Sequence, residues 1–180
     1  MSKFTRYQYL MVLILLCSRT GFAHPGHGAE GLLQGLLHPL SGFDHLFAAL
    51  GVGLWAGRFS GAARRSLPAF FVLGSLCGGL GGLLGYLFPY FEVGIQFSLL
   101  FLGLALLFSP AIPMVFSTVL MLVFGFMHGS AHGSELGGDL AVLQFFIGFV
   151  VCTALLHGVG IVLARVLEKK PGVLLNSISS

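Results

Sequence analysis

Residues 140–165, LAVLQFFIGFVVCTALLHGVGIVLAR, decide the fold class of this chain. The stretch carries no charged side chain before Arg165. As a helix rising about 1.5 Å per residue, it is long enough to cross a hydrocarbon core of about 30 Å. A helix is favoured because backbone groups in lipid must be satisfied within their own segment, and the stretch lacks the two-residue alternation of a β-barrel strand. It therefore predicts a transmembrane helix.

Similar apolar runs recur along the chain. Of the 180 residues, 56% are hydrophobic and only 8% are charged, whereas about a quarter of the residues in a soluble protein are charged. We expect membrane spans at about 31–57, 68–88, 93–109, 111–131 and 140–165, joined by short loops. The predicted fold is an all-α integral membrane protein, a compact bundle of about five transmembrane helices without a soluble domain.

The first 23 residues are typical of a secretory signal peptide. Lys3 and Arg6 precede the apolar stretch YLMVLILLC, and the small residues Gly21 and Ala23 suit a cleavage site. The precursor would then hold six hydrophobic segments, and residues 24–180 would form a single transmembrane domain. An uncleaved anchor remains an alternative, since the apolar core of this segment is short.

The basic residues predict an orientation. Signal cleavage removes three of the nine Lys and Arg residues, which leaves six against six acidic residues. The basic balance of the full chain therefore gives no reason to expect a nucleic-acid partner. Lys and Arg near span ends stay in the cytoplasm. Five spans place the first loop and the segment after the last span on the same side of the membrane, which is then the cytoplasmic side. These two regions hold all six remaining basic residues, namely Arg58, Arg64, Arg65, Arg165, Lys169 and Lys170.

Small residues in the spans indicate close helix packing. Gly74, Gly78 and Gly82 recur every four residues, and small residues at this spacing let helix backbones approach each other in lipid. A groove that exposes backbone to a permeating ion is the alternative. Cys77 and Cys152 lie inside predicted spans, where small buried thiols are ordinary core residues.

The first polar motif lies in the first span. His38 and His45 are seven residues apart, nearly two helical turns, so both would project from one face. Asp44 would either bind a metal beside the imidazoles or hold one of them through its ring N–H. Pro39 is expected to interrupt the helix, and Gly42 adds local freedom. Ionisable groups in a span are unfavourable by about 2.5–3.5 kcal/mol at the helix centre, so a compensating role is expected.

The second motif lies at the outer end of the fourth span. His128 and His132 are four residues apart and Glu135 is seven residues from His128, so all three share one face if the helix continues that far. Imidazoles at this spacing suit a divalent transition metal. Both motifs fall in the outer half of the membrane in the predicted orientation. We therefore expect the two motifs to meet and form one metal site.

Three further histidines are weaker candidates. His24 and His27 would begin the mature protein, where they would either capture metal at the outer face or form a flexible polar terminus. His157 lies deep in the fifth span, where it is either bonded to a neighbouring group or an exit-side metal ligand.

These residues resemble the HupE/UreJ family of small bacterial membrane proteins. The family motifs are His, five residues, then Asp-His, and Phe-His-Gly-x-Ala/Val-His-Gly-x-Glu. The first corresponds here to His38, Asp44 and His45, and the second to His128, His132 and Glu135, with Met127 in place of the phenylalanine. Loss of that aromatic neighbour would loosen the site, and a thioether nearby would admit other metals.

The resemblance implies a nickel(II) permease of the bacterial inner membrane that supplies hydrogenase or urease maturation. The mature amino terminus would be periplasmic and the carboxyl terminus cytoplasmic. Nickel is the transported substrate, cobalt is the next candidate, and no organic cofactor is implied. Imidazole and carboxylate ligands would also accept zinc or copper.

Two other functions remain open at this point. One is an intramembrane zinc metallohydrolase, with Asp44 and histidines on the metal and Ser41 and Glu135 as polar catalytic groups. The other is a metal-sensing or chaperone-like subunit without its own pore. The chain has no G-x-x-x-x-G-K-[ST] phosphate loop, so transport would be passive, ion-coupled or driven by a partner.

Overall fold

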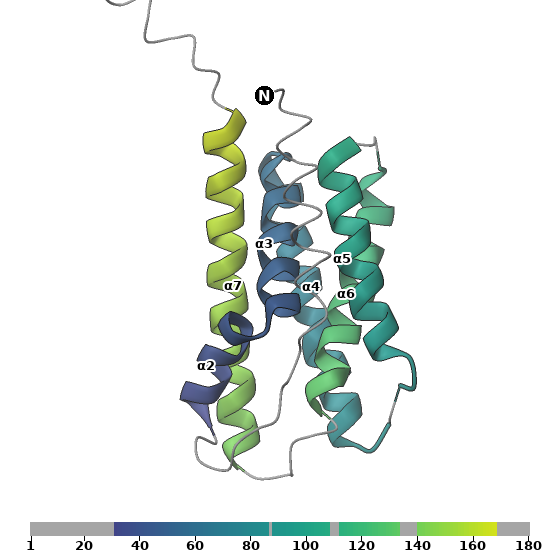
Figure 1. Cartoon of the computed structure of the whole chain (residues 1–180), viewed down its shortest axis with the longest axis vertical. Coiled ribbons are helices and arrows are strands. Elements are labelled where there is room, and N and C mark those ends of the chain that lie inside the picture. Colours follow the sequence, from purple (N-terminus) through teal and green to yellow (C-terminus); the bar gives the residue numbers. More distant parts are fainter. Residues whose placement is uncertain (1–30, 87, 109–111, 134–139, 169–180) are drawn as a thin grey trace, which may run out of the picture.

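The computed structural model of the chain describes residues 31–86, 88–108, 112–133 and 140–168. Within these ranges the chain is all helical (Figure 1). Four helices, α4 to α7, are long and apolar enough to cross a membrane, and the chain is accordingly a membrane protein. The six helices are α2 (Leu32–Ser41), α3 (Phe43–Gly57), α4 (Gly61–Leu83), α5 (Phe91–Phe108), α6 (Met114–Gly133) and α7 (Leu140–Glu168).

The last three predicted spans agree with α5, α6 and α7 to within a few residues. The second predicted span, 68–88, is less accurate, because α4 already begins at Gly61 and ends at Leu83. Hydropathy marks the part of a helix that is apolar, whereas the first turns of α4 carry Arg64 and Arg65. A polar helix end that extends beyond the apolar run is therefore missed.

The first predicted span, 31–57, is two helices. Pro39 was expected to interrupt it, but Pro39 lies buried within α2, and the break falls at Gly42. Gly42 adopts an extended backbone, with φ −88° and ψ 111°, between Ser41 at the end of α2 and Phe43 at the start of α3. The Gly42 N–H donates to the His38 carbonyl at 3.1 Å. Pro39 therefore does not open the last turn of α2, and the chain changes direction at Gly42.

Helices α2 and α3 both pack against α7, α2 near its start and α3 further along (Figure 1). Glycines permit the contact, because a Cβ added at Gly35 would overlap the Phe145 backbone, and a Cβ added at Gly53 would overlap the carbonyl of His157. Near the other end of α3, Gly57 packs in the same way against Ala164. From residue 145 to residue 164, α7 rises by about 29 Å. The broken pair therefore matches the length of one membrane crossing.

Helices α4 and α6 form the second close pair. A Cβ added at Gly74 or Gly78 of α4 would overlap carbonyls of α6, and one added at Gly125 or Gly129 of α6 would overlap carbonyls of α4. The predicted packing role of Gly74 and Gly78 is confirmed. A Cβ at Gly81, by contrast, meets no atom within 4 Å among the described residues. Gly74 and Gly78 therefore lie in the interface with α6, whereas Gly81 does not.

The apolar side chains divide between the bundle interior and its outer surface. Ala48, Val52, Phe71 and Met121 are buried in the interior, while leucines such as Leu80 and Leu155 are exposed on the outside. An apolar exterior is unfavourable in water and suits a hydrocarbon solvent. α5 contacts α3 and α6 and stands at the edge of the bundle (Figure 1).

Candidate metal centre

Three imidazoles from three helices meet inside the bundle. His38 lies near the end of α2, His45 near the start of α3 and His132 near the end of α6. One nitrogen of each ring lies within 4.8 Å of the corresponding nitrogens of the other two. His45 and His132 are buried and His38 is half-buried. Atoms this close need only small side-chain adjustments to bind one transition-metal ion at about 2.0–2.1 Å.

The break at Gly42 positions the first two imidazoles. The sequence predicted that His38 and His45 project from one helical face of a span interrupted at Pro39, whereas the structure places them on two helices, α2 and α3, separated at Gly42. Their ring centroids nevertheless lie 5.2 Å apart. The change of direction at Gly42, rather than helical periodicity, brings the rings together.

Hydrogen bonds fix the protonation of the rings. His45 Nδ1 donates to Asp44 Oδ1 at 3.0 Å, because a carboxylate only accepts. His45 Nε2 then carries a lone pair and accepts from His132 Nε2 at 2.8 Å. A carboxylate that holds the far nitrogen of a metal-binding histidine orients the ring and raises its basicity. Of the two roles considered for Asp44, this contact corresponds to orienting His45.

His128 lies one turn before His132 on α6, and its ring centroid is 5.1 Å from that of His45. Its Nδ1 donates to the Phe124 carbonyl at 2.9 Å, so Nε2 carries the lone pair. Within the described part of the chain, this buried Nε2 has no hydrogen-bond partner. His128 is therefore next to the three-imidazole cluster, with a nitrogen free to bind a cation.

Two phenylalanines of α7 form a wall beside the cluster, and sequence reasoning missed both. The Phe149 ring lies 5.5 Å from that of His132 and 6.0 Å from that of His45, and the Phe145 ring lies 5.7 Å from that of His38. The two residues are four apart and so share a helix face. An apolar wall strengthens the attraction between an ion and its ligands because it excludes water.

The other predicted site residues lie elsewhere. Glu135, His24 and His27 are outside the described residues. His157 is buried on α7 and contacts the Phe71 ring, with centroids 5.4 Å apart. Neither ring nitrogen of His157 has a hydrogen-bond partner among the described residues. The expected hydrogen bond to a neighbouring group is therefore not observed there.

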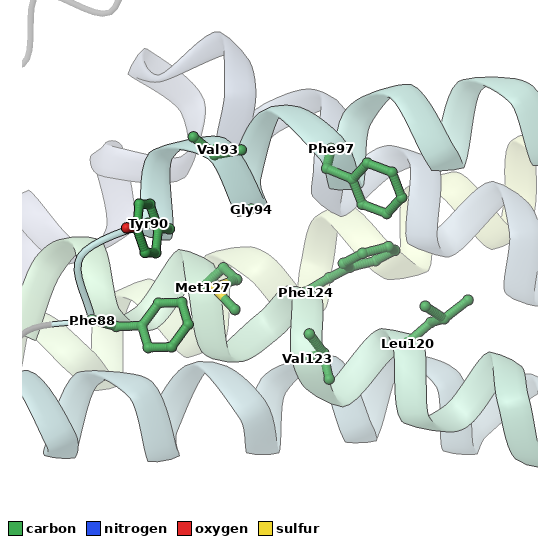
Figure 2. A pocket seen from close by; sticks show the side chains of 9 residues that line it. All are labelled: Phe88, Tyr90, Val93, Gly94, Phe97, Leu120, Val123, Phe124 and Met127. Atoms are coloured by element: carbon green, nitrogen blue, oxygen red, sulfur yellow. The ribbon is translucent and has the colours of Figure 1, made fainter.

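Met127, which stands where the family motif has phenylalanine, points toward α5. It lines a pocket of about 360 Å³ between α5 and α6, and a Cβ added at Gly94 of α5 would lie 2.8 Å from its sulfur (Figure 2). The pocket is formed by apolar and aromatic side chains, namely Phe88, Tyr90, Val93, Gly94, Phe97, Leu120, Val123, Phe124 and Met127. The thioether therefore packs on the α5 side of α6.

Comparison with known proteins identifies the family of this chain. Residues 12–179 match the family described as HupE / UreJ protein. The chain is 34% identical over 150 residues to Protein HupE of Rhizobium leguminosarum bv. viciae, which covers 83% of this chain and 78% of the relative. No solved structure matches. Because the match spans nearly the whole sequence, the chain belongs to the HupE/UreJ family.

Proposed function

We propose that the protein is a permease that takes up nickel(II) across the bacterial inner membrane and supplies hydrogenase or urease maturation. The observation that carries the proposal is the meeting of His38, His45 and His132 from three separate helices. Buried imidazoles in a membrane are unfavourable unless they are paired or bind a substrate. Family membership supports transport rather than catalysis.

Each residue of the two motifs has a role in this mechanism. The three imidazoles replace part of the water shell of the ion, Asp44 orients His45, and His128 receives the ion one turn further inward. Glu135 would contribute a carboxylate at the outer face, and His24 and His27 would collect metal there. Imidazole nitrogen is a good ligand for nickel, with cobalt the next candidate.

The helix arrangement supports five crossings, with α2 and α3 together forming the first. In the proposed orientation the mature amino terminus is periplasmic and Arg58, Arg64 and Arg65 are cytoplasmic. The membrane potential then drives a divalent cation inward by about 4.6 kcal/mol per 100 mV, since each charge contributes about 2.3 kcal/mol. This energy suffices for uptake without nucleotide hydrolysis.

Radiolabelled nickel flux into proteoliposomes with an inside-negative potential tests the proposal. Wild-type protein should carry nickel, and excess cobalt should compete more strongly than zinc. His132→Ala should abolish flux while leaving membrane insertion intact. Tyr86→Phe is the matched control, because Tyr86 is exposed and lies outside the cluster. Wild-type flux in His132→Ala would refute the proposed site, and a wild-type protein that carries no nickel would refute the function.

The metallohydrolase is not favoured by the geometry of Ser41. Its hydroxyl donates to the His38 carbonyl at 3.0 Å, so it stabilises the end of α2 and is not oriented as a nucleophile. The sensor or chaperone-like function is distinguished by the same flux measurement, because only a permease moves nickel as purified protein.

A further inference from the structure

Few buried side-chain nitrogen and oxygen atoms of the described chain lack a hydrogen-bond partner, and all of them lie on three residues. They are Ser117 Oγ, His128 Nε2 and both ring nitrogens of His157. Ser117 is fully buried, and His128 and His157 are each 1% exposed. Buried polar groups are normally hydrogen-bonded, because an unpartnered one has lost its water and gained nothing in exchange. Each of the three therefore requires an explanation.

The three residues follow one another down the bundle interior. His128 lies about 6 Å inward of His132, one helical turn along α6. His157 lies about 12 Å further along α7 than Phe149, which contacts the cluster. Ser117 is on the same face of α6 as His128, about three turns further inward. The order from the cluster is thus His128, His157 and Ser117.

The ring of Phe71 joins the first two of these levels. It is 2% exposed, and its centroid lies 5.3 Å from that of His128 and 5.4 Å from that of His157. The two imidazoles therefore approach the same aromatic side chain of α4 from two different helices. Among the described histidines, His157 is therefore the next buried imidazole inward of His128.

His157 also lies beside a pocket. It lines a pocket of about 450 Å³ between α4 and α7, together with Val72 and Ile161, and this pocket extends to Arg64 and Arg65. These arginines mark the end of the bundle that is predicted to be cytoplasmic. The imidazole thus lies between the outer cluster and a pocket at the inner half of the protein.

We propose that His157 is a second, inner binding station for the transported divalent cation, and that Ser117 supplies an oxygen further along the same path. The inference rests on the proposed function. A single imidazole binds a transition metal more weakly than three imidazoles do, which suits a station that must release its ion. The unpartnered nitrogens of His157 receive the ion after it leaves His128.

A binding measurement on the purified full chain in detergent tests the station directly. Calorimetric titration of wild-type protein with nickel should resolve one tight site and one weaker site. His157→Leu should remove only the weaker site and leave the affinity of the tight site within about twofold. Its melting temperature should be equal or higher, because replacing an unpartnered buried polar group by an apolar one of similar size is neutral or stabilising.

Nickel flux provides the second readout. In proteoliposomes, His157→Leu should reduce nickel flux by about tenfold or more. Loss of a group that supports metal binding typically lowers metal affinity or activity by about 10–100-fold, and tenfold is the lower end of that range. Cys152→Ala is the matched control, since Cys152 is also buried on α7 but contributes to neither station. The control should keep wild-type flux and both binding sites.

The outcomes separate this inference from the proposed function. Wild-type flux and two nickel sites in His157→Leu would overturn the inner station and leave the permease intact. A wild-type protein that carries no nickel would overturn the permease. The binding titration would then still decide the role of His157, because His157→Leu either loses or keeps the weaker nickel site. If His157→Leu fails to fold, the double variant His38→Ala/His132→Ala replaces it. That variant should retain only the weaker site, and its absence would overturn the inner station.

Discussion

The contact between Asp44 and His45 makes a quantitative prediction for Asp44→Asn. The amide keeps the shape of the carboxylate but loses its charge, and hydrogen bonds with one charged partner are about twice as strong as neutral ones. Mutation of a group that orients a metal ligand typically weakens metal binding by about 10–100-fold, or about 1.4–2.8 kcal/mol. We therefore expect Asp44→Asn to bind nickel about 10–100-fold more weakly than wild type.

Calorimetric nickel titration of purified Asp44→Asn measures this change at the tight site. Ser41→Ala is the control, because Ser41 is close in sequence and its hydroxyl donates only to the His38 carbonyl in the described contacts. The control should bind nickel as wild type does. An affinity of Asp44→Asn within about twofold of wild type would show that the carboxylate does not orient His45, whereas a loss far above 100-fold would indicate that Asp44 is itself a ligand.

Three further predictions concern packing, orientation and protonation. Gly129→Ala should lower the melting temperature, because its Cβ overlaps the Ser75 carbonyl and overpacking is unfavourable by about 1–3 kcal/mol. Gly81→Ala has free space and should not lower it. In a variant without native cysteines, a membrane-impermeant maleimide applied from the periplasmic side should label Tyr86→Cys and leave Ser60→Cys unlabelled; the reverse pattern would invert the proposed orientation. Lowering the pH far enough to protonate the cluster should weaken nickel binding, because protons compete for imidazole nitrogens; a calorimetric affinity that stays constant down to the pH at which the protein unfolds would exclude imidazole ligands.

Hydropathy and residue spacing predicted the membrane helices and the histidine-containing motifs of this protein. Both are local properties. An apolar run must become a helix in lipid because its backbone has no other partner. Arg64 and Arg65 show the limit of this reasoning, since they belong to α4 although hydropathy excludes them.

Only the tertiary structure decided which residues meet. Gly42 turns the chain between His38 and His45, three residues after the proline that was expected to break the helix, and α2 and α3 both pack on α7. Phe149 joins the cluster because glycine contacts such as that of Gly35 with Phe145 set the register of α7. The sequence by itself therefore determined the helices and the chemistry of the motifs. Close backbone contacts between helices, which no single segment encodes, decided how those motifs combine.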